Sequence, residues 1–237
     1  MNTLSNNIIV NESGASAQIE NYKIVIIGDQ HVGKTSILSK YKYETIEEGY
    51  APTVGIDFIT KNVFLEDKTI RLIMWDTAGQ ERFKSLIPSY LKNAHSIILT
   101  YDITSKPSFS SLSKWIEDIK NHVQDGVFFV LCGNKVDLKN KRQVSFDEAE
   151  KFAKDNNLNY VETSAITGEG IKKLFDIITH SFYDGGNNIV NESQIKDKPI
   201  VLDTTLQKVD DVKVKKNCCG KGKKNEKNLF FFFFFFF

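Results

Sequence analysis

Residues 28–35 read GDQHVGKT and fit the pattern G-x-x-x-x-G-K-[ST] of a phosphate-binding loop, or P-loop. Glycine at 28 and 33 allows several backbone N–H groups to face one point, and a following helix adds its positive dipole end. We expect Lys34 to bridge terminal phosphates and Thr35 to ligate Mg²⁺. The alternative is a glycine-rich turn without a ligand. The expected nucleotide contacts here are Gly28, Gln30, His31, Val32, Gly33, Lys34, Thr35 and Ser36.

A P-loop alone does not distinguish ATP from GTP, but GNKVD at 133–137 does. The Asp137 carboxylate can accept two hydrogen bonds from a guanine edge that adenine lacks. Asn134 would meet the acceptor side of the base and tie this loop to the P-loop, while the stem of Lys135 lies over the ring. A site built to hydrogen-bond its ligand rejects an analogue without those groups by roughly 10⁴–10⁵. Taken alone, NKVD could be any polar loop; its position after a P-loop favours guanine recognition.

The next segment, ETSA at 162–165, ends another predicted strand. The Ala165 backbone N–H is placed to donate to the guanine oxygen, and the neighbouring Ser164 and Ile166 complete the predicted base contacts.

The segment WDTAGQE at 75–81 follows the apolar run at 70–76. Asp76 would hold Mg²⁺ through water, the Gly79 N–H would approach a γ-phosphate, and Gln80 would orient the attacking water. If the P-loop assignment failed, Asp76 would be an ordinary turn residue at a strand end.

The segment YAPTVGIDF at 50–58 supplies Thr53 as a second Mg²⁺ ligand. Thr53 and Gly79 would both be held by the γ-phosphate and its metal and released after hydrolysis. That is an order–disorder switch.

Strands and helices that would position these residues alternate along the chain. Buried or alternating apolar runs predict strands, with a hairpin at EDK (66–68), and apolar spacing of three and four predicts helices. The Ser145/Glu148 pair predicts a capped helix start. Such a series implies an α/β, P-loop NTPase fold with a mostly parallel sheet and helices on both faces. The predicted strands are 23–28, 56–65, 70–76, 96–102, 127–134 and 159–163, and the predicted helices fall within 109–123, 145–153 and 171–182.

Composition and length constrain the protein class. The 237 residues divide into a flexible arm (1–21), one domain (22–183) and a tail (184–237). A net charge of +1 argues against nucleic-acid binding, and the N-terminus lacks the features of a signal peptide. We therefore expect a cytoplasmic protein in which Cys132 packs within a strand and the Asn-x-Ser triplets at Asn11 and Asn191 carry no glycan.

Residues 22–183 resemble a Ras-superfamily small GTPase of the Rab branch. The stretches GIDF (55–58), WDTAGQERF (75–83) and YDIT (101–104) resemble Rab-specific segments, and LEDKTIRL with ERFKSLIPSY resembles the Golgi-associated Rab subgroup numbered six. The resemblance implies six strands, with 56–65 antiparallel, and a cycle between membrane-bound GTP and extractable GDP forms.

The resemblance also implies partners and a contact surface. An exchange factor, a GTPase-activating protein, a GDP-dissociation inhibitor or escort protein, and effectors are expected, the effectors binding an aromatic triad. As a bare sequence, these aromatic residues could equally be core or hairpin residues. The triad is Phe58, Trp75 and Tyr90.

Departures from the family concern the base and the catalytic centre. Ile46 replaces an aromatic residue beside the guanine, which could weaken nucleotide binding by about 1 kcal/mol, and TSAK reads TSAI at Ile166. No arginine is placed by motif at the phosphates, so intrinsic hydrolysis should be slow. An arginine supplied by an activating protein would be worth roughly 10³–10⁵ in rate.

The tail departs from the family as well. Cys218 and Cys219 lie in a lysine-rich segment that suits prenylation and an anionic membrane surface, yet the chain continues to a phenylalanine run at 230–237. Three interpretations stay open: an apolar anchor, an unprenylated soluble protein, or a tail translated from an intron. We favour the last of these.

The functional expectation is a small GTPase switch for vesicle traffic on the cytoplasmic face of the Golgi or related endomembranes. One alternative is a nucleotide-binding module that does not hydrolyse GTP and acts only as an effector scaffold. Another, a metabolic P-loop ATPase or kinase, is disfavoured by Asn134 and Asp137.

Overall fold

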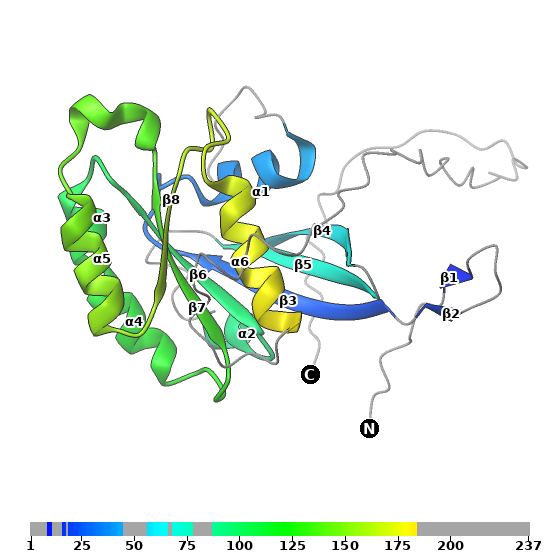
Figure 1. The fold of residues 1–237 in the computed structure, drawn as a ribbon. Helices are drawn as coiled ribbons and strands as arrows, with labels where there is room; N and C mark the ends of the chain where they lie inside the picture. The colour runs from blue at the N-terminus through cyan, green and yellow to red at the C-terminus, as the bar shows by residue number, and fades with distance from the viewer. Residues whose placement is uncertain are drawn as a thin grey trace, which may run out of the picture. The chain divides into compact units, whose positions relative to one another are not determined.

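A six-stranded sheet runs through the computed structural model, which describes residues 9–10, 16–17, 19–44, 56–65, 68–77 and 87–183 (Figure 1). β4 (Ile56–Phe64) pairs antiparallel with β5 (Thr69–Thr77), and every other neighbouring pair in this sheet is parallel. This confirms the predicted α/β, P-loop NTPase fold with one antiparallel strand. In spatial order the strands are β4 (Ile56–Phe64), β5 (Thr69–Thr77), β3 (Ile19–Ile27), β6 (Ser96–Asp102), β7 (Phe128–Asn134) and β8 (Asn159–Thr163).

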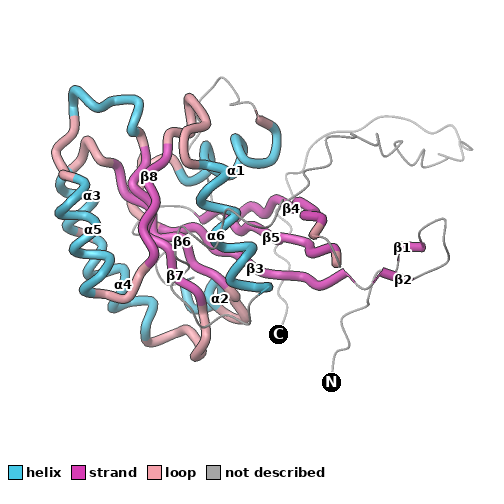
Figure 2. The backbone as a smooth tube through the Cα atoms, in the orientation of Figure 1, coloured by secondary structure: helices cyan, strands magenta, loops and turns pink. Residues whose placement is uncertain are grey.

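Helices cover both faces of the sheet, as predicted (Figure 2). α1 (Lys34–Tyr43) and α6 (Ile171–Tyr183) pack on one face, and the helices that lie between them in the chain pack on the other. A 3-10 helical segment at Val136–Lys141 follows β7. The helices are α1 (Lys34–Tyr43), α2 (Ile87–Leu91), α3 (Lys106–Ser110), α4 (Leu112–Lys120), α5 (Phe146–Asp155) and α6 (Ile171–Tyr183).

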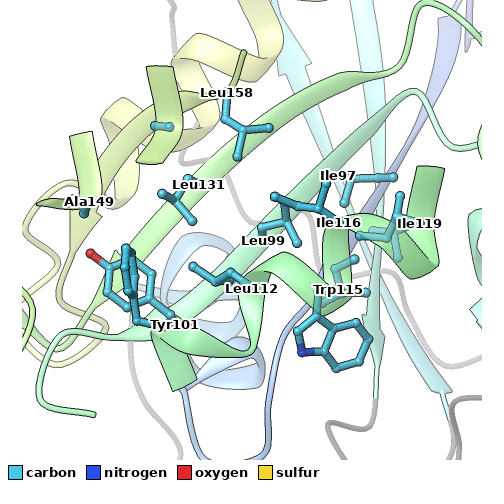
Figure 3. Close-up of a cluster of buried hydrophobic side chains, with 14 of the residues drawn as sticks. Ile97, Leu99, Tyr101, Leu112, Trp115, Ile116, Ile119, Leu131, Ala149 and Leu158 are labelled. Atoms are coloured by element: carbon cyan, nitrogen blue, oxygen red, sulfur yellow. The ribbon is translucent and has the colours of Figure 1, made fainter. Parts of the chain in front are cut away.

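The continuous apolar run of β3 explains why it is buried on both sides. Successive side chains of a strand point to opposite faces, so Ile24 and Ile26 pack beneath α1 and α6, whereas Val25 and Ile27 pack beneath α2 to α5. Figure 3 shows part of the second cluster, where Trp115 and its neighbours on α4 meet Leu99 and Leu131 of the sheet. The P-loop therefore emerges from a strand that both cores hold in place.

The predicted helix within 109–123 is observed as α3 and α4, which meet at Ser111. Ser111 keeps helical torsions (φ −72°, ψ −15°), and its hydroxyl donates to the Ser108 carbonyl at 3.0 Å. The last turn ends at Lys120 rather than near Val123. The predicted start of α5 is confirmed, because the Glu148 N–H donates to Ser145 Oγ at 3.2 Å. The predicted hairpin is closed by the Leu65 N–H, which donates to the Lys68 carbonyl at 2.9 Å.

The N-terminal segment contains more regular structure than the aperiodic arm predicted for residues 1–21. β1 (Ile9–Val10) and β2 (Ser16–Ala17) form a short antiparallel pair. β3 begins at Ile19 because that residue pairs with Thr69 of β5. Across the described residues, no helix combines the length and apolar character that crossing a membrane requires.

Candidate nucleotide site

The P-loop joins β3 to α1. The two glycines of its motif are needed because neighbouring atoms lie too close for a side chain and because the backbone torsions are unusual. Gly28 has a φ of 143°, and a Cβ there would lie 2.1 Å from the Thr100 carbonyl oxygen. Gly33 has a φ of 96°, and a Cβ there would lie 2.3 Å from Asn134 Nδ2. Side chains at either position would push the loop away from the ends of β6 and β7. The loop therefore lies directly against these strand ends.

The start of α1 suits an anion. Gly33 is its N-cap and provides no side-chain cap, and the first turn carries no acidic residue. The first backbone N–H groups of a helix lack intrahelical acceptors, so a phosphate oxygen can accept from them. Of the predicted contacts, Val32 is buried and Ser36 is half-buried. Gln30, His31 and Thr35 are exposed.

Lys34 directs its ammonium into the loop. The side chain is 6 % exposed, and Nζ donates to the carbonyls of Gly28 at 2.9 Å and Asp29 at 2.8 Å. Desolvation lowers the pKa of Lys34 to about 8, although the negative charges of Asp76 and Asp29 act in the opposite direction. The lysine thus lies where the sequence predicts phosphates, and an anion bound beside it would favour its charged form.

The structure brings together two of the three predicted Mg²⁺ ligands. Thr35 Oγ1 donates to Asp76 Oδ2 at 2.5 Å. Asp76 is buried near the end of β5 and pairs in register with Ile26 of β3, so the strand pairing places it beside the P-loop. Mg²⁺ prefers oxygen ligands and is commonly held by one or two carboxylates together with phosphates. The donor set of Thr35 and Asp76 fits that ion.

Several predicted site residues lie outside the described residues, and their roles stay predictions. They are Ile46, Thr53, Gly79, Gln80, Cys218 and Cys219.

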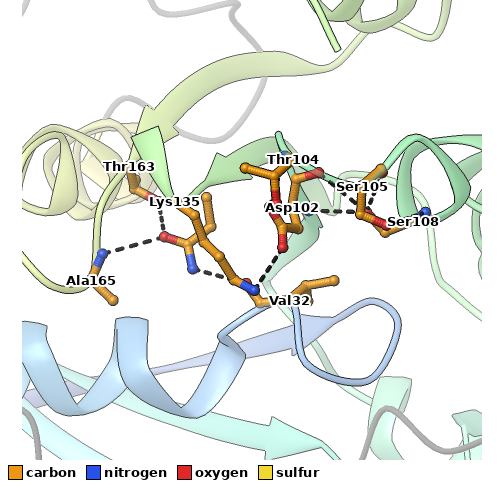
Figure 4. A network of polar contacts seen from close by, with 9 residues as sticks. Val32, Asp102, Thr104, Ser105, Ser108, Lys135, Thr163 and Ala165 are labelled. Atoms are coloured by element: carbon orange, nitrogen blue, oxygen red, sulfur yellow. Dashed lines mark hydrogen bonds and ion pairs between the residues drawn. The ribbon is translucent and has the colours of Figure 1, made fainter. Parts of the chain in front are cut away.

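On the guanine side, Asn134 bonds to three residues that Figure 4 labels, Val32, Thr163 and Ala165. Its side chain is 1 % exposed, and Nδ2 donates to the Val32 carbonyl at 2.8 Å. This is the predicted tie to the P-loop. Oδ1 accepts from Thr163 Oγ1 at 3.2 Å and from the Ala165 N–H at 3.3 Å. The Ala165 N–H that was predicted to meet the guanine oxygen thus has a long bond to Asn134, and its contact with the base stays a prediction.

Lys135 is fixed by a residue that sequence reasoning missed. Its φ of 73° is left-handed, and its Nζ lies 2.6 Å from Asp102 Oδ2. The other oxygen of Asp102 accepts from the Thr104 N–H at 2.8 Å and from Thr104 Oγ1 at 2.7 Å. Figure 4 shows the ion pair between Asp102 and Lys135. Asp102 ends a buried strand at the same sheet edge, and this position in the sequence could have marked it as a site residue. The ion pair holds the lysine stem beside the base loop.

Asp137 is oriented by Ser164, whose hydroxyl donates to Asp137 Oδ1 at 2.6 Å. Ser164 Oγ in turn accepts from the Thr167 N–H at 3.1 Å. The predicted base contact Ser164 thus acts on the carboxylate of Asp137 in this structure. Ile166, by contrast, is 67 % exposed.

A second missed residue, Arg142, supports the strand that ends at the base loop. Its guanidinium donates to both carboxylate oxygens of Glu162, at 2.6 and 2.8 Å, and this pairing raises the pKa of Arg142. Glu162 also accepts from the Tyr160 hydroxyl at 2.8 Å. Because Glu162 immediately precedes the segment with Ser164, the network fixes where that segment begins. No motif marks Arg142, and only its distant partner reveals it.

The predicted contact surface is partly assembled. The rings of Phe58 and Trp75 lie 6.3 Å apart on adjacent strands, and Phe58 is 61 % exposed. Lys23 Nζ lies 4.0 Å from the centre of the Trp75 ring. Tyr90 is 2 % exposed and packs in the core beneath α2. Its place in a contact surface stays a prediction.

Cys132 packs within β7, as predicted. It is fully buried, and burial raises the pKa of its thiol to about 12. It therefore behaves as a small core residue.

A comparison with protein-family models matches residues 23–184 to the Ras family. The match contains the P-loop, Asp76 and both guanine-side loops. The chain therefore belongs to the Ras family and is a small GTPase.

Proposed function

We propose that this GTPase is a Rab-branch switch that regulates vesicle-mediated membrane traffic at the Golgi or related endomembranes. The observation that carries the guanine-nucleotide part is the Asn134 side chain, which bonds to Val32 and so joins the P-loop to the base-reading loops. The Rab-like stretches at 55–58, 75–83 and 101–104 support the branch.

In the proposed mechanism, Lys34 and the first N–H groups of α1 bind the phosphates. Asp137, held by Ser164, selects guanine. Thr35, Thr53 and Asp76 would hold Mg²⁺, which neutralises phosphate charge when bound. Gln80 orients the attacking water. Intrinsic hydrolysis is slow because no arginine is placed by motif at the phosphates, and an activating protein supplies one.

Switching requires partners and a membrane. An exchange factor loads GTP, effectors bind the GTP form at Phe58 and Trp75, and an inhibitor or escort protein extracts the GDP form. Prenylation of Cys218 and Cys219 beside their lysines would supply the anchor, because two lipid chains with a basic segment satisfy the requirement for stable attachment.

A single-turnover assay tests the enzymatic part of this proposal. Purified protein loaded with GTP should release phosphate slowly and faster with a Rab-specific activating protein, and Gln80→Leu should abolish the acceleration. Excess ATP should not displace labelled GDP. Absence of hydrolysis, even with activating proteins, would favour the scaffold alternative that binds nucleotide without hydrolysing it.

Mass spectrometry of the native C-terminal peptide tests the membrane part. Prenylated cysteines without the phenylalanine run are expected. An unmodified peptide ending in 230–237 would contradict prenyl anchoring. In cells, a tagged Gln80→Leu variant should accumulate on Golgi membranes and Cys218→Ser/Cys219→Ser should remain dispersed, whereas identical distributions would contradict the proposed location.

A further inference from the structure

Asp29, the second residue of the P-loop, is anchored outside the nucleotide site. Its Oδ1 accepts from the Trp115 indole N–H at 2.7 Å, and its Oδ2 accepts from the Ser111 hydroxyl at 2.7 Å. Both donors lie where α3 meets α4, more than eighty residues along the chain.

The donors are held firmly. Trp115 is buried among the side chains beneath α4, and the single hydroxyl proton of Ser111 is shared between Asp29 and the Ser108 carbonyl, whose oxygen lies 3.0 Å from Ser111 Oγ. Hydrogen bonds to a charged carboxylate are stronger than neutral ones. The anchor therefore fixes the Asp29 side chain to a buried part of the core.

The main chain of Asp29 contacts the predicted phosphate-binding lysine. Its carbonyl accepts from Lys34 Nζ at 2.8 Å, next to the bond from Nζ to Gly28. One residue thus connects the buried helix junction to the lysine predicted to bind phosphate. Loss of the side-chain anchor would free the peptide that directs the lysine.

We propose that Asp29 is a positioning residue, which holds the P-loop against the α3–α4 junction and thereby slows release of guanine nucleotide. This rests on the guanine-nucleotide binding proposed above. The competing explanation is structural: a buried indole N–H needs an acceptor, and Asp29 would then serve Trp115 rather than the loop. The two explanations differ in what happens when both partners are removed.

The experiment measures GDP dissociation by chasing a fluorescent GDP, together with urea unfolding. Asp29→Ala should release GDP about tenfold faster or more, because it loses two bonds to a charged group. Trp115→Phe, which removes one donor, should have a smaller effect of about threefold. Asp29→Asn should stay near the wild type, since an amide can accept from the indole and donate to Ser111. Asp155→Ala, an exposed aspartate on α5, is the matched control and should change neither quantity.

The double variant Asp29→Ala/Trp115→Phe separates the explanations. It no longer buries an indole N–H without its acceptor, so its resistance to urea should recover relative to Asp29→Ala, while GDP release stays fast. Recovery of the wild-type release rate would overturn the proposal, as would an unchanged rate in Asp29→Ala. If Asp29→Ala does not fold, GDP release is measured in Ser111→Ala and Trp115→Phe instead. An unchanged release rate in both variants would overturn the proposal. Failure of the wild type to bind GDP would instead overturn the proposed function itself.

Discussion

The guanine side and the phosphate side of the site satisfy their polar groups differently. On the guanine side, Asn134 and Ser164 bond to groups on other loops, so the bonds join separate segments of the protein. On the phosphate side, Lys34 bonds to the carbonyls of its own loop and Thr35 bonds to Asp76. Lys34, Thr35 and Asp76 are the residues predicted to bind phosphate and metal.

The difference indicates how each side responds to a ligand. A base can bind beside Asp137 without disturbing the bonds that hold the guanine-side loops, and such preorganisation lowers the cost of binding. Phosphates must compete with loop carbonyls for the Lys34 ammonium. We therefore expect the guanine side to control which nucleotide binds and the phosphate side to control how binding depends on charge and pH.

The largest expected effect is on the guanine side. Asp137→Asn should weaken GDP binding by roughly 10⁴-fold, because the carboxylate that accepts from the guanine edge is lost. Binding of xanthosine diphosphate should improve, since its edge offers an acceptor to the new amide. The asparagine can still accept from Ser164, so the loop should persist. Competition binding measures both affinities, with Asp155→Asn as the control. An unchanged preference for GDP would contradict the assignment of base selection to the guanine side.

The next effect is on the phosphate side. Lys34→Ala should weaken GDP binding by about 10³-fold, because two charge-assisted contacts to phosphate are lost. Its preference for GDP over ADP should not change, since the base loops are intact. Lys114→Ala on the exposed face of α4 is the control. Equilibrium binding with fluorescent nucleotides tests this, and a change in base preference would show that the two sides are not separable.

The pH dependence should also come from the phosphate side. Burial sets the pKa of Lys34 at about 8 in the free protein, and a bound polyphosphate raises it. Binding then takes up a proton above pH 8, so GDP affinity should fall as the pH rises, by at most about tenfold per pH unit. Lys34→Met should lack this component while keeping any titration of the base. Equal pH slopes in the two proteins would contradict the assignment.

The smallest effect should come from removing Arg142, which supports a strand on the guanine side. Arg142→Met should lower the free energy of unfolding by about 1 kcal/mol, because the Arg142–Glu162 pair is partly exposed to solvent. Arg142→Lys should restore part of this loss, since an ammonium cannot make both guanidinium bonds. Urea unfolding measures the change. A loss as large as that caused by removing a core side chain would contradict this prediction. It would mean that the pair stabilises the whole fold and not only the base loop.

Elements with a strong apolar pattern were predictable from sequence. Along β3, alternate residues fill two cores, and burial on both faces requires the continuous run that marks the strand. The start of β3 was predicted too late, because Ile19 joins the sheet through its pairing with Thr69 rather than through any local pattern. The helix end at Lys120 was missed because apolar spacing continues to Val123 after the hydrogen bonding has changed.

The sequence by itself determined the local chemistry of this protein: the P-loop, the NKVD segment and the family to which they belong. Each is short and contiguous, and its glycines and side chains act through backbone geometry that neighbouring residues set. Only the tertiary structure decided which distant groups complete the site. Asn134 meets Thr163, Lys135 meets Asp102, and Asp29 meets Trp115 because parallel strands end at a common edge and helices pack over it. Such contacts depend on packing between segments far apart in the chain, which no local pattern encodes.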